Sequence, residues 1–500
     1  MFSDNKEIKE LIKISNELSD IGSAAGLMAW DQETYMPPKG ALVRAHALAT
    51  VSGMYHEKLT NPKIGALLSS LERATRRSLN LYDRALVREV KREYEKAIKL
   101  PKRLVEEISE ATSAAFEAWR GAKEKSDFPK FAPKLTRLLK LKVQAAKMLQ
   151  KKGQTVYDVM LDDYEEGLTE AEVERVFGPI KPKLSLLAET LGKQTLGRDR
   201  VFEKMKFERE TLVATGREIM TAMGYDWEAG RQDVSAHPFE ISFGIGDVRT
   251  TTWKEDRGIS EMVMVAMHET GHGLYEQGID PGLERTHLGG GQGLVLHESQ
   301  SRLWENMVGR GSEFWKYYYP MFQSKVPGLR KITLKDFLKG INVVAPSLVR
   351  VEADEVTYGL HIMARFEIER ALIAGKIKVD DLPRVWNAKY KELLGITPKS
   401  DREGVLQDVH WSHGSFGYFP TYLLGTMTSA QIWHKVPERI KKLTNGDLKP
   451  LRVWLKENIH KHGRVYTARE LVRKVTGEDL NPDYFLEYLE NKFKKLYNLE

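Results

Sequence analysis

The hydrophobic and polar positions of this sequence follow helical periodicity over most of its 500 residues. Residues 81–100 (LYDRALVREVKREYEKAIKL) and 105–125 (VEEISEATSAAFEAWRGAKEK) place apolar side chains three and four positions apart, which is typical of amphipathic helices. Residues 481–499 follow the same pattern and predict a helix that closes the chain. Two residue pairs have the spacing of a capping box and predict helix starts: Thr169 with Glu172, and Thr467 with Glu470.

One segment, residues 237–253 (HPFEISFGIGDVRTTTW), departs from the helical pattern. Its apolar residues alternate with other residues, and Gly246-Asp247 stands where a turn would fall, so the segment predicts a strand or hairpin. Those alternating residues are Phe239, Ile241, Phe243 and Ile245. A short sheet at this place could accept a peptide as an additional strand.

These patterns predict a mainly α fold in which residues 1–500 form a single large helical domain with a small β-hairpin or sheet. The sequence contains no internal repeat, no low-complexity segment and no linker long enough to separate domains. Hydrophobic residues make up 41% and charged residues 29% of the chain, which suits a sizeable buried core.

Charge and cysteine content restrict the class of protein further. The net charge is +7, and basic residues alternate with acidic ones, as in residues 89–110, so we expect solvated helix faces and no nucleic-acid partner. The absence of cysteine excludes disulfides and thiolate metal ligands, and it fits a reducing compartment or a thermophilic source. The sequence has no apolar signal core and no run long enough to span a membrane, so we expect a cytoplasmic protein.

The segment MHETGH, residues 267–272, carries the clearest chemistry. Residues four apart on a helix project from one face, so His268 and His272 can bind one metal ion together. Glu269 is displaced by one position and can take a proton from water that the metal activates. The surrounding residues 260–278 have helical periodicity, and Gly278 could end the helix.

A catalytic zinc site needs a third protein ligand and an open position. No third histidine follows in the spacing of the longer metzincin motif, so a downstream glutamate is expected instead. Glu298 is the favoured candidate because it begins a second helical stretch; Glu284 and Glu276 compete, although we expect Glu276 to be solvated. The glycine-rich residues 287–297 lack the Gly-Lys-Ser/Thr of a phosphate loop and predict a flexible connection near the site.

Over nearly its whole length, the chain resembles the metallocarboxypeptidases of the carboxypeptidase Taq type. The resemblance begins at residues 29–40 (AWDQETYMPPKG), ends at residues 417–425 (GYFPTYLLG), and includes six motifs in order. These are His237-Pro238-Phe239, Asp247-x-Arg249-x-Thr251, His268-Glu269-x-x-His272, His297-Glu298-Ser299-x-Ser301, Val349-Arg350-x-x-Ala353-Asp354, and Gly404-x-x-Gln407-Asp408-x-His410-Trp411. The fourth fits loosely, because Gln300 directly follows Ser299 where the family usually has glutamine one place further along.

The resemblance implies a helical fold with a deep active-site cleft, shared with neurolysin and angiotensin-converting enzyme, and N-terminal helices that could cover the cleft. It also implies a thermostable homodimer, one zinc or cobalt ion per chain, and release of C-terminal amino acids from peptides with broad specificity.

Each of the remaining candidate residues could have either a role in the site or a structural role. His237, His410 and His413 could bind the scissile carbonyl or the oxyanion, and Tyr418 and Tyr422 could donate hydrogen bonds to it; a structural histidine or an aromatic core stripe is the alternative. Arg350 could bind the substrate's terminal carboxylate, with Arg249 as second candidate. Within the chain, Arg350 could instead pair with Glu352 or Asp354, and Arg249 with Asp247.

Two other functions share parts of this chemistry. An oligoendopeptidase would use the same metal site inside a longer peptide. A structural metal site in a helical binding protein would have four protein ligands and no open position.

Overall fold

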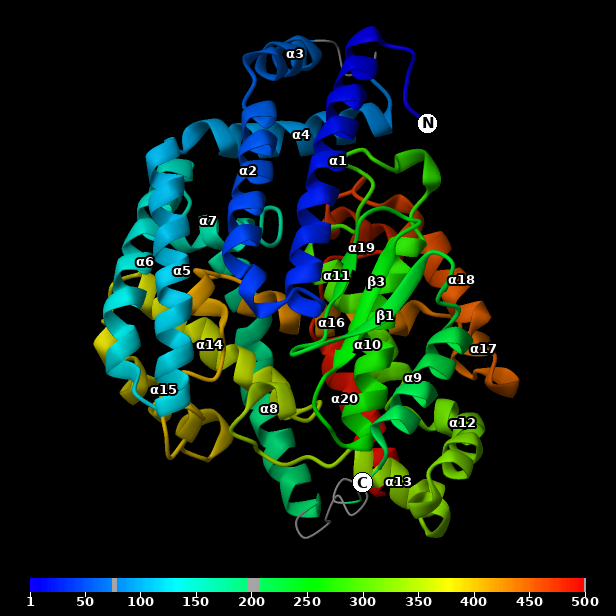
Figure 1. Ribbon diagram of the computed structural model, residues 1–500. Coiled ribbons are helices and arrows are strands. Elements are labelled where there is room, and N and C mark those ends of the chain that lie inside the picture. The colour runs from blue at the N-terminus through cyan, green and yellow to red at the C-terminus, as the bar shows by residue number, and fades with distance from the viewer. Residues whose placement is uncertain (74–78, 196–204, 206, 499–500) are drawn as a thin grey trace.

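The chain folds mainly into α-helices, and one small sheet packs against α10 and α1 at one side of the molecule (Figure 1). This computed structural model describes residues 1–73, 79–195, 205 and 207–498. The helices before the sheet are α1 (Lys6–Thr34), α2 (Ala41–Leu59), α3 (Pro62–Arg73), α4 (Leu81–Lys99), α5 (Lys102–Lys125), α6 (Phe128–Leu149), α7 (Val156–Asp162), α8 (Glu170–Thr195) and α9 (Arg209–Met223). The helices after it are α10 (Ile259–Gln277), α11 (Gly293–Arg302), α12 (Ser312–Lys325), α13 (Leu334–Ile341), α14 (Thr357–Ile373), α15 (Leu382–Leu394), α16 (Phe419–Lys435), α17 (Glu438–Lys441), α18 (Lys449–Asn458), α19 (Ala468–Thr476) and α20 (Asp483–Tyr497).

The predicted hairpin forms two strands of a three-stranded sheet. β2 (Glu240–Ser242) runs antiparallel to β3 (Val248–Trp253), and Phe243 N donates to Asp247 O at 2.9 Å across the turn. The third strand, β1 (Gly230–Ser235), pairs in parallel with β3, which gives the order β1-β3-β2. β1 could not be predicted, because its sequence GRQDVS has neither alternation nor a β-branched run.

Both capping boxes lie at helix starts, as predicted. Thr467 is the N-cap of α19 and exchanges hydrogen bonds with Glu470 in both directions. The Glu172 backbone N donates to Thr169 Oγ1 at 3.2 Å at the start of α8. These contacts satisfy backbone donors that a helix end leaves open, which is why the local sequence alone could identify them.

Most of the core lies in two large hydrophobic clusters and a smaller one. The first cluster joins α5 to α8 with α14, α15, α16 and α20. The second joins α9, α10, α12, α13, α18 and α19, and the smaller one joins α1, α3 and α4. Helices α11 and α16 pack against each other between the two large clusters, and this central pair carries part of the site described below.

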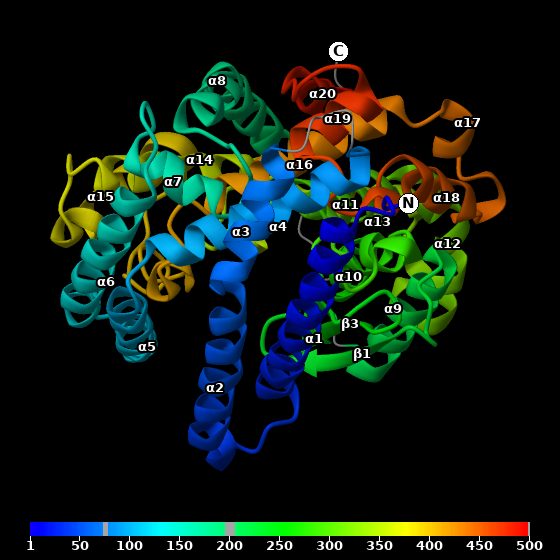
Figure 2. The ribbon, with the colours of Figure 1, turned by 90° about the horizontal axis from the view of Figure 1, so that it is seen from above.

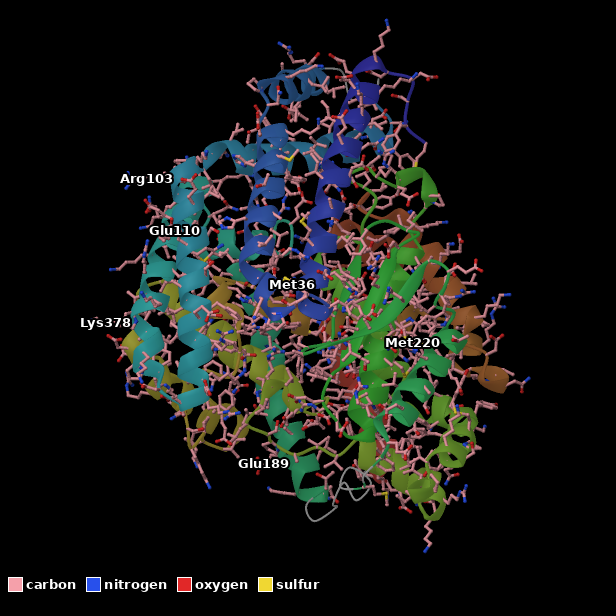
Figure 3. All side chains as sticks on the ribbon, viewed as in Figure 1. Met36, Arg103, Glu110, Glu189, Met220 and Lys378 are labelled. Atoms are coloured by element: carbon pink, nitrogen blue, oxygen red, sulfur yellow. The ribbon has the colours of Figure 1, made fainter. Side chains whose placement is uncertain are left out.

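Helices α1 and α2 pack together and stand out from the rest of the molecule (Figure 2). Met36 lies in their connection (Figure 3), and α1 also contacts β1 and β2. Charged residues of α5, such as Arg103 and Glu110, are exposed at the edge of the molecule (Figure 3), as expected for a solvated face. The same expectation is wrong for Glu89 of α4, which is 9% exposed. Among the described helices, none is long and apolar enough to cross a membrane.

Candidate metal centre

Three side chains from two helices converge on one point. His268 and His272 project from the same face of α10, and Glu298 projects toward them from α11. The Oε2 atom of Glu298 lies 3.7 Å from His268 Nε2 and 3.6 Å from His272 Nε2. Both distances exceed a normal hydrogen bond but lie near the ~3.4 Å separation between ligand atoms in a tetrahedral zinc site. The donor set therefore fits a divalent metal, and it is the set that the sequence predicted.

Two glycines allow the close packing that places Glu298. A Cβ on Gly271, between the two histidines of α10, would lie 2.6 Å from Ser301 Cα of α11. A Cβ on Gly425 of α16 would lie 2.7 Å from Glu298 Cβ. Because such contacts cannot be accommodated without a shift of the backbone, glycine at these positions lets α10, α11 and α16 approach closely.

Each histidine is held by a hydrogen bond on its second ring nitrogen. His268 Nδ1 contacts Glu305 Oε2 at 2.8 Å, and His272 Nδ1 contacts His297 Nδ1 at 2.6 Å. His297 Nε2 in turn contacts Glu276 Oε1 at 2.9 Å. This arrangement assigns the protons to the outer nitrogens and leaves Nε2 of His268 and His272 free to bind a metal.

Glu276 is not solvated, contrary to the sequence-based expectation. It is 6% exposed, and besides His297 its carboxylate accepts hydrogen bonds from Gly291 N at 2.8 Å and Ser242 Oγ at 3.1 Å. Its position one turn after His272 puts it on the buried face of α10, where it orients His297 without joining the three converging atoms. The other competitor, Glu284, accepts a hydrogen bond from Ile245 N at 3.2 Å in the hairpin turn.

Arg302 fixes the second oxygen of Glu298. Its Nε donates to Glu298 Oε1 at 2.7 Å, and its Nη1 donates to Glu305 Oε2 at 3.1 Å. Although burial opposes ionisation, Arg302 and His268 lower the pKa of Glu305 to about 2 and hold that of Glu298 well below its usual range. Both carboxylates are therefore charged at neutral pH, as metal binding and histidine orientation require.

Glu305 belongs to a π-helical turn, η4 (Leu303–Val308), that directly follows α11. Such turns are rare and frequently occur at functional sites. Here the turn follows the helix that carries Glu298 and directs Glu305 to His268. Neither Glu305 nor Arg302 was predicted from the sequence. The only local signal was that Glu305 lies seven residues after Glu298, a spacing that puts two residues on one helix face.

Glu269 stands beside the three converging atoms and lines the same cavity. It is 6% exposed, and burial, with the nearby carboxylates Glu298 and Glu305, raises its pKa to about 7. A carboxyl group with this pKa can both accept and release a proton near neutral pH. The structure thus places Glu269 as the HExxH spacing predicted.

The cavity has a volume of about 510 Å³ and separates α10 and β2 from a wall formed by residues 350–358 and 418–422. His237, Tyr418 and Tyr422 line it, as does Arg350. Burial, with Glu298 nearby, raises the pKa of Tyr418 to about 12, so its hydroxyl keeps its proton and can donate a hydrogen bond. The predicted cleft is therefore present, and the two tyrosines line it together with the candidate metal ligands.

The other two candidate histidines do not line the cavity. His410 lies behind the tyrosines, where its Nε2 contacts Tyr422 Oη at 3.1 Å. His413 is exposed and packs against Phe116 with ring centroids 5.0 Å apart. The two belong to one short helical turn, η8 (His410–His413), but only His410 is joined to the cavity by a hydrogen bond.

The sequence left Glu352 and Asp354 open as partners of Arg350 within the chain, but Arg350 pairs with neither of them. Its Nε donates to Asp408 Oδ1 at 2.9 Å, and its guanidinium lies 4.9 Å from the Tyr422 ring centre. Residues 350–352 form a short 3-10 turn, η6 (Arg350–Glu352), so the expected helical neighbours point elsewhere. Asp354 caps the start of α14 through Thr357 N at 2.9 Å.

Arg249 pairs with Asp247 within the hairpin, as one sequence interpretation proposed. Its Nε and Nη2 donate to the two oxygens of Asp247 at 2.7 and 2.8 Å. The guanidinium also lies 4.3 Å from the Trp30 ring centre in α1. Arg249 does not line the cavity, so the structure does not bring this second candidate for carboxylate binding to the site.

The glycine-rich connection between α10 and α11 is packed tightly against the site. A Cβ on Gly291 would lie 2.6 Å from His297 Cδ2 and 2.8 Å from Glu276 Oε1. Gly293 has a φ of +56° and approaches Glu165. The glycines thus serve close approach and a left-handed backbone conformation, a more specific role than the flexible connection that was expected.

Comparisons with known proteins agree with this geometry. The sequence model of a family described as carboxypeptidase Taq (M32) metallopeptidase matches residues 10–493. The chain is 39% identical to thermostable carboxypeptidase 1 of Pyrococcus furiosus, covering 98% of this chain and 99% of the relative. It is 38% identical to thermostable carboxypeptidase 1 of Thermus thermophilus, covering 98% of both chains. A solved structure of the Pyrococcus furiosus carboxypeptidase superposes with a TM-score of 0.95 at 38% identity, covering 98% of this chain and 99% of that one.

Proposed function

The chain belongs to the carboxypeptidase Taq (M32) metallopeptidase family, and from this premise we propose which residues of this metal-dependent carboxypeptidase hold the metal, move the proton and bind the peptide. The family assignment favours removal of C-terminal residues over the oligoendopeptidase alternative. It also argues against a purely structural metal site. The observation that carries the proposal is the convergence of His268, His272 and Glu298 beside Glu269 in one cavity.

One divalent metal ion, either zinc or cobalt, would be held by His268 Nε2, His272 Nε2 and Glu298 Oε2. Two imidazoles and one carboxylate form a common ligand set of catalytic zinc sites, which leave a position open for water or substrate. When bound, the metal acidifies water and polarises the carbonyl of the peptide bond. Glu305 and His297 keep the two imidazoles in the orientation and tautomer that binding requires.

Glu269 would act as general base and then as general acid. Its carboxylate takes one proton from the attacking water and delivers it to the amine nitrogen of the departing residue. A pKa of about 7 suits both steps near neutral pH. Burial raises this pKa, His268 lowers it, and the carboxylates of Glu298 and Glu305 raise it further.

The wall opposite α10 would stabilise the developing oxyanion. Tyr418 and Tyr422 line the cavity with hydroxyl groups that can donate hydrogen bonds to it, and His237 adds a third polar side chain there. His410 would act through Tyr422, which it holds by a hydrogen bond. We assign no role in the cleft to His413, because it is exposed and packs against α5.

Arg350 would bind the terminal carboxylate of the peptide and so make the enzyme trim ends. It is 6% exposed, faces the cavity and remains charged beside Asp408. A fixed carboxylate contact would place the last peptide bond over the reacting groups. The chain would release C-terminal amino acids with broad specificity, since the proposed recognition is of the terminal carboxylate and not of the side chain of the released residue.

The test of the proton-transfer step is the variant Glu269→Gln. It should retain metal, because Glu269 supplies none of the three converging atoms, while kcat falls by about a hundredfold or more, as on loss of a general base. Metal content, circular dichroism and mass spectrometry of peptide digestion together give the answer. Near-full activity in this variant contradicts the mechanism.

Chelation tests the role of the metal itself. Removal of the metal should leave a folded protein that releases no C-terminal residues, and addition of zinc or cobalt should restore release. Apoprotein that stays active, or a metal that is needed only for folding, contradicts a catalytic site.

We also propose that residues 1–500 act as one catalytic unit, that α1 and α2 cover the cleft, and that two chains form a homodimer, as the family resemblance implies. Light scattering of the purified protein tests the dimer. A cytoplasmic location stays a prediction from the cysteine-free composition.

A further inference from the structure

A second, smaller cavity opens beside the catalytic cleft. It has a volume of about 320 Å³ and shares Glu240, Leu294 and His297 with the main cavity. Its other walls include α4, the residues that follow α7, the connection before α11, and single residues of β2 and α10. A space of this size can hold one extended side chain.

Carboxylates dominate the lining of this side cavity. Five acidic residues face it, against two arginines and His297: Glu89, Asp163, Glu166, Glu240 and Glu276. Both arginines are already engaged, since Arg92 pairs with Asp162 at 2.9 Å and Arg464 donates to Gly291 O at 3.2 Å. Three of the acids likewise have partners: Glu89 with Arg88, Asp163 with Lys96, and Glu276 with His297.

Two carboxylates are left without hydrogen-bond donors. In the described part of the chain, neither Glu240 Oε1 nor Glu166 Oε2 accepts a hydrogen bond, although both atoms are buried. The nearest cation to Glu166 is the Arg88 Nε, at 3.8 Å. Burial raises the pKa of both groups: that of Glu240 well above its usual range, with Glu276 adding to the effect, and that of Glu166 although Arg88 opposes the rise. A cation bound in this cavity would offset part of the cost of burying these carboxyl groups.

Gln292 supplies an independent observation. It is 4% exposed and lines the same cavity, yet its Oε1 is a buried acceptor that receives no hydrogen bond from any described residue. A buried acceptor without a donor is costly, so it points to a bound group that the protein itself does not provide. A bound group with hydrogen-bond donors would fit, because Glu166 Oε2, Glu240 Oε1 and Gln292 Oε1 receive no hydrogen bond from any described residue.

The arrangement does not fit a second metal ion. Among the described residues, only His268, His272 and Glu298 bring three ligand atoms as close together as a metal needs. The acidic groups of the side cavity are spread around a space larger than a bare ion. A flexible group with several hydrogen-bond donors suits such a space better.

We propose that the side cavity binds an ammonium group of the peptide substrate, on the amino side of the bond that is cleaved. The group would be carried by a lysine side chain or by the free amino terminus of a short peptide. This inference rests on the proposed function, because it takes the terminal carboxylate to be held at Arg350. No residue of the Arg350 wall, 350–358 or 418–422, lines the side cavity.

The sheet gives the peptide a path between the two places. Glu240 begins β2, an edge strand that pairs only with β3 on its inner side. An extended peptide can pair with the outer side of such a strand. A peptide with its carboxylate at Arg350 would then cross the site and bring its preceding residues to Glu240 and the side cavity.

Two pairs of short peptides separate the sources of the ammonium group. The first pair is acetyl-Ala-Lys-Leu against acetyl-Ala-norleucine-Leu, which differ in the charged group; the second is Ala-Ala-Leu with a free or an acetylated amino terminus. In at least one pair the charged peptide should have a kcat/KM about tenfold higher, the effect of one charge-assisted hydrogen bond. The pair that shows the preference identifies the source.

Glu166→Gln is the decisive variant, because Glu166 lines the side cavity and not the catalytic one. It should reduce the preference to about twofold or less, and Glu240→Gln should do the same. Glu110→Gln, at an exposed position of α5, is the matched control and should keep the preference. Melting temperatures show whether each variant is folded.

A binding measurement keeps the inference testable without turnover. In Glu269→Gln, calorimetry should show about tenfold tighter binding of the charged peptide, and Glu166→Gln in that background should abolish the difference. Equal kcat/KM and equal Kd for charged and uncharged peptides, or a preference that survives Glu166→Gln, overturns the inference. If leucine is released from none of the peptides while the binding preference is intact, the proposed function is contradicted instead.

Discussion

Replacing Arg350 by methionine should remove the preference for peptides with a free C-terminal carboxylate. Methionine keeps much of the apolar stem and removes the charge. The guanidinium is buried beside Asp408 and faces the cavity, so a substrate carboxylate would meet it with little competing water. Truncation of one partner in such a pair costs about 2 to 5 kcal/mol of binding free energy.

The structure places the expected loss at the lower end of that range. The carboxylate of an unbound peptide is hydrated, and with the variant it can stay in water. The substitution therefore does not leave an unpaired charge buried. A loss of about 3 kcal/mol corresponds to roughly a hundredfold decrease in kcat/KM. The fold should survive, because Asp408 keeps its second partner: Arg365 Nε donates to Asp408 Oδ2 at 2.7 Å.

The assay compares free and amidated forms of one peptide with both enzymes. Amidation should cost the unmodified enzyme about a hundredfold in kcat/KM and should cost Arg350→Met little. Metal content should be equal in both proteins, and Arg350→Lys should recover part of the activity through its charge. If the unmodified enzyme cuts amidated and free peptides equally well, Arg350 does not bind the terminus and the reasoning fails.

Three further predictions concern the support of the site and its pH dependence. Gly271→Ala should lower both the melting temperature and the metal affinity, since its Cβ would lie 2.6 Å from Ser301 Cα; thermal unfolding with and without metal shows this, and an unchanged affinity contradicts the packing argument. Glu305→Gln should weaken metal binding about 10- to 100-fold through the loss of a charged partner for His268, and metal competition with a chromophoric chelator measures it. Burial raises the pKa of Glu165 from 4.5 to about 8, so the stability it contributes is full below about pH 4.5 and is lost as the pH rises through about 8. Glu165→Gln should therefore be the more stable protein above pH 8, by on the order of 3 to 5 kcal/mol; parallel denaturant titrations at pH 5 and 9 test the sign.

Local patterns of the sequence determined the parts of this protein that depend on neighbouring residues. The four-residue spacing put His268 and His272 on one face of α10, and Gly278 ends that helix, because helix geometry is the same in every context. The capping residue Thr467 and the hairpin of residues 240–253 followed from equally local rules. Glu298 lies on α11 close to the two histidines, whereas the sequence left it as one of three candidate glutamates.

Contacts between distant segments decided the rest. The position of Glu276 in the sequence predicted a solvated side chain. In the structure, Gly291 and His297, which follow α10 in the chain, bind its carboxylate and bury it. Arg350 found its partner 58 residues away in Asp408, while nearer acids serve other contacts. Helical periodicity reports which residues share a face, whereas burial and charge pairing depend on which other segment packs against that face. A buried charge needs a partner in space, and only the tertiary structure determines which residue that is.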